Sequence, residues 1–181
     1  MRITGGEWAS RRIVGPPTRS SIRPTPDALR EQAFAVLAPH LAGARFLDLF
    51  AGTGVNSLEA LSRGAAAAVL VDEAGGAAAL VRRNFAALEV APERWELIVR
   101  PADKAVRLLS ERGWRCQLAW CDPPFAAWEA GPSALAAAAE AGVLAPGALV
   151  VLELPPRREV AIPGFTAVRS LRGAVLLQAH K

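Results

Sequence analysis

The stretch FLDLFAGTGVNSLEAL, residues 46–61, sets a short apolar run directly against a glycine turn and a helical segment. Gly52 and Gly54 let the backbone turn tightly and approach a ligand without a Cβ in the way. In open α/β sheets, ligands bind just beyond the carboxyl ends of the strands, and the first strand-to-helix turn is the usual place. The stretch therefore predicts an α/β fold with a binding site at this turn.

The residues on the C-terminal side repeat the same alternation of short apolar runs and helical segments. Strands are predicted at 44–50, 67–72, 95–101, 116–122 and 148–155, and helices at 57–64, 77–88, 103–113 and 133–142. Apolar strands separated by helices of about three turns indicate a parallel sheet covered on both faces. After Pro155 and Pro156, the runs at 165–171 and 174–180 leave no room for a helix, which predicts an antiparallel hairpin. We expect a Rossmann-like α/β fold with a mostly parallel seven-stranded sheet.

The N-terminal side differs from this pattern and carries the chain's excess of positive charge. Residues 2–8 and 10–17 suggest two short strands around a turn, and 23–41 a helix with Thr25 as its cap and Pro26 in its first position. We divide the chain into an extension at 1–40 and a main domain at 41–181. Residues 1–24 hold five arginines and one glutamate, a net charge of +4 that equals that of the whole chain. This concentration favours contact with a polyanion, the alternative being a merely solvated tail.

Composition limits the class of protein. The 181 residues fit one domain with a sizeable core, and we expect a soluble, unprocessed, cytoplasmic protein because no segment reads as a leader or a membrane span. Cys116 and Cys121 should lie on opposite faces of one strand as reduced thiols. No cluster of cysteines and histidines has the spacing of metal ligands, so we expect no metal.

Acidic residues around the glycine turn indicate which nucleoside would bind. Asp72 follows Gly52 by twenty residues and ends a strand, where it is placed to accept hydrogen bonds from ribose hydroxyls. A dinucleotide fingerprint would need glycine where Ser57 stands, and Asp48 would repel a pyrophosphate but attract a cationic amine. S-adenosylmethionine, with its ammonium and sulfonium, suits Asp48 better than NAD does. Asp103 is a candidate acceptor for the adenine amino group and, alternatively, a helix N-cap.

A second motif, DPPF at residues 122–125, follows the strand at 116–122 and should lie at the same sheet edge. Pro123 and Pro124 remove two N–H donors, so that nearby carbonyls can act as acceptors. Asp122 can accept the hydrogens of an exocyclic amine and then take a proton once the nitrogen is alkylated. Phe125 offers a face on which a planar base can stack. The alternative is a simple β-turn that ends a strand.

The order of these motifs resembles the RsmD family of class I S-adenosylmethionine-dependent methyltransferases. The similarity rests on RITGGEW, RPTPDALREQAFAVL, FLDLFAGTGVNSLEALSRGA and DPPF, and it covers essentially the whole chain. It implies transfer of a methyl group to N2 of one guanine, at nucleotide 966 of 16S ribosomal RNA, with the small subunit or an assembly intermediate as substrate. It also implies cofactor contacts by Asp48, Gly52, Gly54, Asp72 and Asp103.

The same resemblance places the target base at Asp122, Pro123, Pro124 and Phe125. Because a net charge of +4 is concentrated in residues 1–24, we expect Arg2, Arg11, Arg12 and Arg23 to contact RNA phosphates around the mouth of the active site. Trp8 and Trp128 are further candidates for stacking on bases, although large aromatic residues commonly pack into cores.

Two other functions stay open on the residues alone. DPPF suits an adenine-N6 methyltransferase acting on DNA or RNA equally well, and a catalytically silent RNA chaperone would keep the same fold and arm. The missing target-recognition domain disfavours a sequence-specific DNA enzyme. An intact Asp122 and an intact glycine turn argue against the silent chaperone. A nicotinamide-dependent oxidoreductase is disfavoured by Ser57 and by the lack of a suitably placed His or Tyr.

Overall fold

The computed structural model of the chain describes residues 1–16 and 26–180. Arg23 and Thr25 lie outside the described residues, so the predicted RNA contact of Arg23 stays a prediction. The N-cap residue of the first helix is Pro26, so the prediction of Thr25 as the cap and Pro26 as the first helical residue is wrong by one position.

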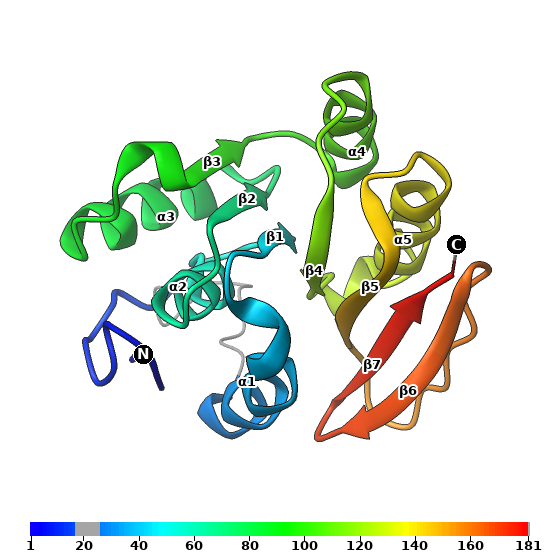
Figure 1. The fold of residues 1–181 in the computed structure, drawn as a ribbon, viewed down its shortest axis with the longest axis horizontal. Helices are drawn as coiled ribbons and strands as arrows, with labels where there is room; N and C mark the ends of the chain where they lie inside the picture. Colours follow the sequence, from blue (N-terminus) through cyan, green and yellow to red (C-terminus); the bar gives the residue numbers. More distant parts are fainter. Residues whose placement is uncertain (17–25, 181) are drawn as a thin grey trace.

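One seven-stranded sheet forms the centre of the molecule, in the order β3-β2-β1-β4-β5-β7-β6 (Figure 1). Neighbouring strands from β3 to β5 pair in parallel, whereas β7 pairs antiparallel with both β5 and β6. The predicted Rossmann-like sheet with a C-terminal antiparallel hairpin is therefore confirmed. The strands are β1 (Arg45–Leu49), β2 (Ala67–Val71), β3 (Trp95–Ile98), β4 (Cys116–Cys121), β5 (Leu144–Glu153), β6 (Phe165–Leu171) and β7 (Ala174–Ala179).

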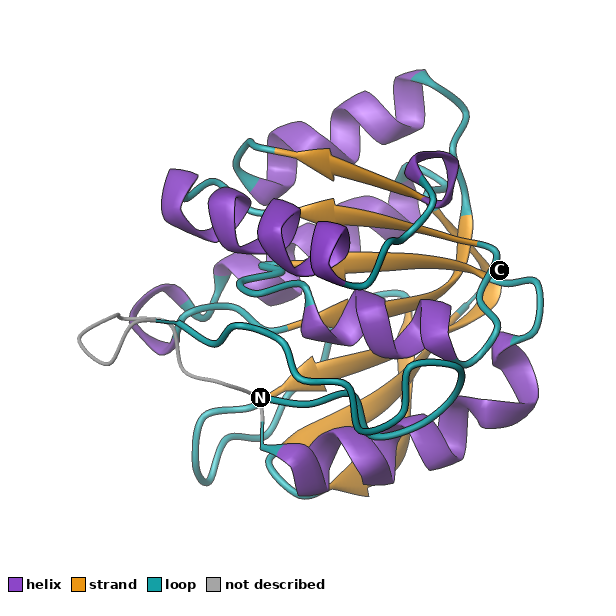
Figure 2. Cartoon of the chain, turned by 90° about the vertical axis from the view of Figure 1, so that its left-hand side faces the viewer, coloured by secondary structure: helices purple, strands orange, loops and turns teal. Residues whose placement is uncertain are grey.

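Helices cover both faces of this sheet (Figure 2). The helices are α1 (Asp27–Leu41), α2 (Val55–Ser62), α3 (Gly75–Ala87), α4 (Ala102–Glu111) and α5 (Ala130–Glu140), with short 3-10 turns η1 (Pro92–Arg94) and η2 (Phe125–Ala127). Side chains of α1, α2 and α3 share one hydrophobic cluster with Phe46 and Trp120, and those of α4 and α5 share the other with Leu47 and Cys121. The two faces follow from the alternation of side chains along each strand.

The start of β4 differs from the prediction. Cys116 and Cys121 are both buried in the same hydrophobic cluster, so their expected placement on opposite faces is wrong. The register of β4 against β5 shifts between Cys116 and Leu118, and such an irregularity moves a side chain to the other face. The neighbouring strand β5 is also longer at this end than predicted, because it begins at Leu144 rather than at residue 148.

The N-terminal residues pack onto the helices. Their predicted hairpin is reduced to one antiparallel bridge between Arg2 and Arg12. Ile3, Trp8 and Ile13 are buried in the cluster of α1 and α2. The backbone N–H of Trp8 donates to Ser62 Oγ at 2.9 Å. Trp8 is therefore a core residue, and its alternative role in stacking on a base is wrong.

A buried arginine joins this N-terminal arm (residues 1–16) to the helices. Arg30 Nη2 on α1 donates to the carbonyl of Arg2 at 2.8 Å and to Asp27 at 2.7 Å. Its Nε lies 3.6 Å from Glu59 on α2, whose carboxylate also accepts the backbone N–H of Thr4. Removing one partner of such a buried pair leaves an uncompensated charge. The arm is thereby fixed on the face of the sheet that carries the glycine turn.

Candidate functional site

The carboxyl ends of four strands are joined edge to edge by backbone hydrogen bonds. The N–H of Asp72, after β2, donates to the carbonyl of Ile98 in β3 at 3.2 Å, and the N–H of Ala51 donates to Val71 at 3.0 Å. The N–H of Asp122, after β4, donates to the carbonyl of Leu49 in β1 at 3.2 Å. The predicted cofactor turn and the DPPF motif therefore lie beside each other, on adjacent strands.

The glycine turn between β1 and α2 needs its glycines. Gly52 and Gly54 have φ values of 56° and 76°, in the left-handed region that favours glycine. A Cβ on Gly54 would lie 3.0 Å from Leu70 and 3.0 Å from Phe85. The turn thus combines an unusual backbone conformation with a close approach to the core.

Asp48 lies under this turn and is fully buried. Its Oδ2 accepts the backbone N–H of Ser57 at 3.1 Å and the Ser57 hydroxyl at 2.8 Å. Serine at the position where a dinucleotide fingerprint has glycine therefore anchors α2 to Asp48. Asp48 Oδ1 is buried and accepts no hydrogen bond from the described residues. Such an acceptor fits a site that receives a cationic ligand.

The other two acidic residues predicted to bind the cofactor, Asp72 and Asp103, differ in their exposure and in their partners. Asp72 is half-buried, and its two oxygens accept the N–H groups of Gly52 and Ala74, each at 2.9 Å. Asp103 lies in the first turn of α4 rather than at the end of β3, is exposed, and pairs with Lys104 at 3.4 Å. Pro101 is the N-cap residue of α4, without a side-chain cap, so the alternative of Asp103 as N-cap is wrong.

The DPPF turn presents polar groups and one aromatic face. Pro123 is buried against α5, where a Cβ on Gly131 would lie 2.6 Å from its ring. The carbonyl of Pro124 accepts the N–H of Ala127 at 2.8 Å, which closes η2. Phe125 has 45% of its surface exposed, as a stacking platform requires. The Pro124 carbonyl is thus already engaged within the turn.

The two tryptophans that flank this turn both donate hydrogen bonds to Glu153, a residue that the sequence analysis did not single out. Trp120 Nε1–H donates to Glu153 Oε1 at 3.0 Å, and Trp128 Nε1–H donates to the main-chain carbonyl of Glu153 at 3.1 Å. Trp128 is buried under the guanidinium of Arg158, so its alternative role in base stacking is wrong. The sequence does contain a signal for Glu153, because it is an acidic residue at the end of an apolar strand. The same pattern identified Asp72 as a candidate.

The site concentrates negative charge. Burial raises the pKa of Asp48 to about 7, and the charges of Asp72 and Glu153 add to the shift while hydrogen bonds from Ser57 oppose it. Burial also raises the pKa of Asp122 to about 8, with Glu153 and Asp48 contributing. A positively charged ligand would relieve this repulsion and favour the ionised carboxylates.

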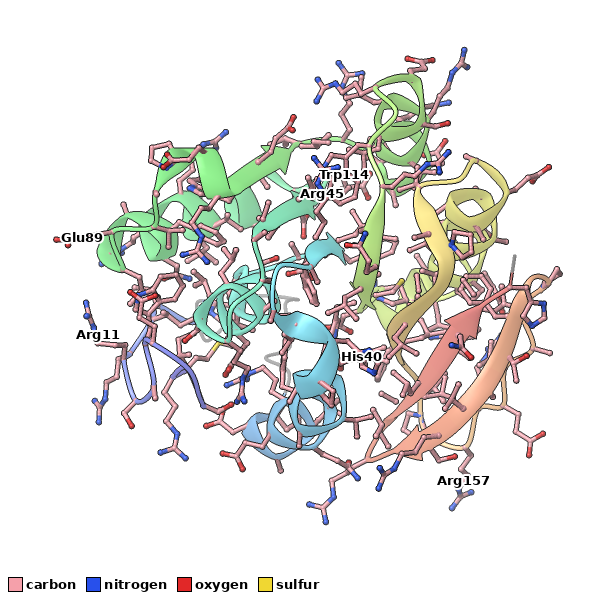
Figure 3. All side chains as sticks on the ribbon, viewed as in Figure 1. Arg11, His40, Arg45, Glu89, Trp114 and Arg157 are labelled. Carbon is pink, nitrogen blue, oxygen red and sulfur yellow. The ribbon has the colours of Figure 1, made fainter. Side chains whose placement is uncertain are left out.

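Three of the four arginines predicted to contact RNA lie on the described part of the arm and are exposed. Arg2 pairs with Asp27 at 3.2 Å, and Arg11 donates to the carbonyl of Ala87 at 3.3 Å. Arg11 and Glu89 both line a surface groove of about 470 Å³ beside the arm, and they lie at one edge of the molecule (Figure 3). This groove is separate from the two turns.

Within residues 1–16 and 26–180, no helix combines the length and apolar character of a membrane span. The same residues contain no group of three or more His, Cys, Asp or Glu side chains arranged to hold a metal ion.

The chain is similar to several known proteins. A model of the family described as conserved hypothetical protein 95 matches residues 1–174. The ribosomal RNA small subunit methyltransferase D of Escherichia coli strain K12 is 37% identical over 125 residues, which cover 69% of this chain and 60% of that relative. The putative rRNA methyltransferase YlbH of Bacillus subtilis is 32% identical over 125 residues, covering 69% and 67% of the two chains. The solved structure of the putative methyltransferase yhhF from Escherichia coli superposes with a TM-score of 0.81 at 28% identity, covering 100% of this chain and 98% of that one.

Proposed function

The chain belongs to the family described as conserved hypothetical protein 95, the RsmD family, and we propose that it is an S-adenosylmethionine-dependent methyltransferase acting on ribosomal RNA. The observation that carries this proposal is the hydrogen bond from Asp122 N–H to the carbonyl of Leu49. It sets a turn suited to a cationic nucleoside beside a turn suited to an aromatic amine.

The first turn would hold the cofactor. The buried carboxylate of Asp48 supplies negative charge beneath the methionine end, and Gly52 and Gly54 allow the backbone to approach it. Asp72, fixed by its bonds from Gly52 and Ala74, would accept from the ribose hydroxyls. Asp103 would reach the adenine from the start of α4. When bound, S-adenosylmethionine supplies a methyl group activated by its sulfonium.

The second turn would hold the target base. Phe125 stacks on its face, while Asp122 and the carbonyl of Pro123 accept the hydrogens of the exocyclic amine. Holding both hydrogens favours a pyramidal nitrogen whose lone pair faces the methyl group. As the nitrogen–carbon bond forms, the carbon–sulfur bond breaks with its electron pair going to sulfur. The carboxylate of Asp122 then takes the proton that the nitrogen loses.

The finer assignment is N2 of the guanine at nucleotide 966 of 16S ribosomal RNA, in the cytoplasm, on the small subunit or an assembly intermediate. The name of the Escherichia coli relative, a ribosomal RNA small subunit methyltransferase, supports the small subunit as the substrate, and N2 of guanine and nucleotide 966 rest on the resemblance of the motifs alone. A base whose amine is to react has to leave its stack or come from an unpaired loop. The exposed face of Phe125 suits a base that arrives in this way.

The test is methyl transfer from radiolabelled S-adenosylmethionine to small subunits that lack the modification, followed by mass spectrometry of the digested nucleosides. The proposal expects N2-methylguanosine at a single position. Label in N6-methyladenosine would overturn the guanine assignment and retain the methyltransferase. Tight cofactor binding with no transfer to any ribosomal RNA would overturn the proposed substrate.

We also propose that RNA phosphates are contacted by Arg2, Arg11 and Arg12 of the arm and by Arg23, which follows the arm outside the described residues. Deleting residues 1–24 is a poor test, because it would remove Ile3, Trp8 and Ile13 from the core. The double variant R11Q/R12Q keeps these apolar side chains. It should weaken RNA binding and reduce the slope of log affinity against log salt by about 1–2, with unchanged cofactor affinity. An unaltered salt slope would contradict the contact.

A further inference from the structure

Glu153 stands beside Asp122 at the carboxyl edge of the sheet. It is the last residue of β5, and β5 lies next to β4 (Figure 1). Cys121 pairs with Leu152, so Asp122 and Glu153 are the next residues on two adjacent parallel strands. The bond from Trp120 to its carboxylate places that group on the face of the sheet where Trp120 packs against α1 and α2. This is also the face of Asp48.

The carboxylate of Glu153 is held in a defined orientation. It accepts Trp120 Nε1–H at 3.0 Å, and the Trp120 ring is itself fixed by stacking on Phe34, with 5.6 Å between the ring centroids. The second indole, from Trp128, holds the main chain of the same residue at 3.1 Å. Trp120 lies two residues before Asp122 and Trp128 three residues after Phe125. Both ends of the DPPF turn are thus tied to Glu153.

Two acidic side chains at neighbouring strand ends form an unusual pair of acceptors. Glu153 is 9% exposed, and its charge contributes to the raised pKa of Asp122 after the larger effect of burial. A carboxylate accepts up to about four hydrogen bonds, so protein contacts such as the bond from Trp120 can orient the group while a ligand also donates to it. Adjacent acceptors of this kind match a ligand edge with adjacent donors.

We propose that Glu153 selects guanine by accepting its N1–H, while Asp122 holds the neighbouring 2-amino group. The Watson–Crick edge of guanine presents these two donors side by side, whereas adenine presents an acceptor at N1. A carboxylate opposite an unprotonated ring nitrogen would be repelled, so the same residue that favours guanine rejects adenine. This inference rests on the proposed function and adds to it the residue that sets the substrate base.

The test uses the RNA substrate of the transfer assay with either guanine or 2-aminopurine at the target nucleotide. 2-Aminopurine keeps the 2-amino group but has an unprotonated N1. A site built to bond an N–H rejects an analogue that lacks it, so the wild-type kcat/KM should favour guanine by roughly 10⁴–10⁵. Wild-type protein that methylates both bases equally would overturn the inference and leave the proposed function standing.

The variant Glu153→Gln tests whether Glu153 itself causes the preference for guanine. Its amide oxygen can still accept from Trp120, and its NH₂ group then faces N1 of the base. The preference for guanine over 2-aminopurine should fall at least about tenfold, because the new donor suits the unprotonated N1. Glu129→Gln is the matched control, since Glu129 is an exposed partner of Arg158 next to Trp128. It should leave the preference as in the wild type.

A purely structural role for Glu153 predicts a different result. Loss of structure would lower transfer to both bases alike and leave their ratio unchanged, and that outcome in E153Q would overturn the inference. The urea midpoint and the cofactor affinity of E153Q establish that the variant is folded. If E153Q does not fold, Glu153→Asp takes its place, with a shortened reach that should also lower the preference. Wild-type protein that transfers no methyl group to guanine would instead overturn the proposed function, and the inference with it.

Discussion

The two turns of the candidate site are held by different sets of hydrogen bonds. In the glycine turn, backbone groups of the turn itself are bonded to side chains: Gly52 N–H donates to Asp72, and the carbonyl of Thr53 accepts from Asn84 on α3. The DPPF turn is held by bonds outside it as well, because the indoles of Trp120 and Trp128, which flank it, donate to Glu153 at the end of β5.

The difference suits what each turn would hold. The glycine turn, which would bind the small cofactor, has its conformation set by its own glycines and by hydrogen bonds to its backbone. The target base, which would come from a large RNA, would contact the exposed ring of Phe125. The tryptophans on either side of this turn are hydrogen-bonded to Glu153. We infer that the first turn sets cofactor affinity and the second sets turnover and base choice, and the following experiments test this division.

The largest expected effect is that of Asp122→Asn on turnover. The amide cannot take the proton that the nitrogen loses, so kcat should fall by about 10²–10⁴. Cofactor affinity, measured by calorimetry, should change by less than a few-fold. An equal loss of turnover and affinity would show that the two turns do not act separately.

Gly54→Ala tests the glycine turn by itself. The added Cβ would meet Leu70 and Phe85 at 3.0 Å, with φ at +76°. We expect a loss of about 2–4 kcal/mol in the free energy of unfolding, measured with urea, and weaker cofactor binding. Gly142→Ala is the matched control, because Gly142 has φ +70° and open space around its Cβ position. It should lose only about 1–2 kcal/mol; equal losses would mean that the close packing at Gly54 is unimportant.

The pH dependence of stability should separate the two carboxyl groups. Burial raises the pKa of Asp48 from 3.8 to about 7 and that of Asp122 from 3.8 to about 8. Between pH 4 and these values the folded protein binds more protons than the unfolded chain, so both groups lower stability as pH rises. Asp48→Asn should remove about 2 kcal/mol of the decrease between pH 5 and pH 7.

The contribution of Asp122 should continue to about pH 8, one pH unit further than that of Asp48. Urea unfolding of the ligand-free wild type, D48N and D122N at successive pH values measures the pH range over which each carboxyl group lowers stability. Parallel curves for the three proteins would contradict the raised pKa values.

The smallest effect is expected for Trp128→Phe, which tests the clamp on the DPPF turn. The variant keeps a buried aromatic ring of smaller size and loses the N–H that donates to the carbonyl of Glu153, and the lost hydrogen bond costs about 1 kcal/mol. A less well-positioned turn should lower kcat/KM for RNA about tenfold without changing cofactor affinity. Trp114→Phe, on the half-buried tryptophan at the opposite end of β4, is the control. An equal effect on cofactor affinity would contradict the separate roles of the turns.

The alternation of apolar runs and helical segments determined the fold and the place of the site. It predicted every strand of the sheet and the edge at which the glycine turn and DPPF meet, because parallel strands joined by helices all end at one edge. Gly52 and Gly54 were predicted from local chemistry, since glycine lacks a Cβ and adopts a positive φ without steric cost.

Tertiary packing decided what these patterns leave open. The burial of Trp8 and Trp128, the position of Asp103 on α4, and the shift that sets Cys116 on the face of Cys121 all depend on neighbours far apart in the sequence. The raised pKa values of Asp48 and Asp122 and the convergence of two indoles on Glu153 have the same origin. Desolvation and long-range hydrogen bonds are properties of a packed environment, which no local stretch of sequence specifies.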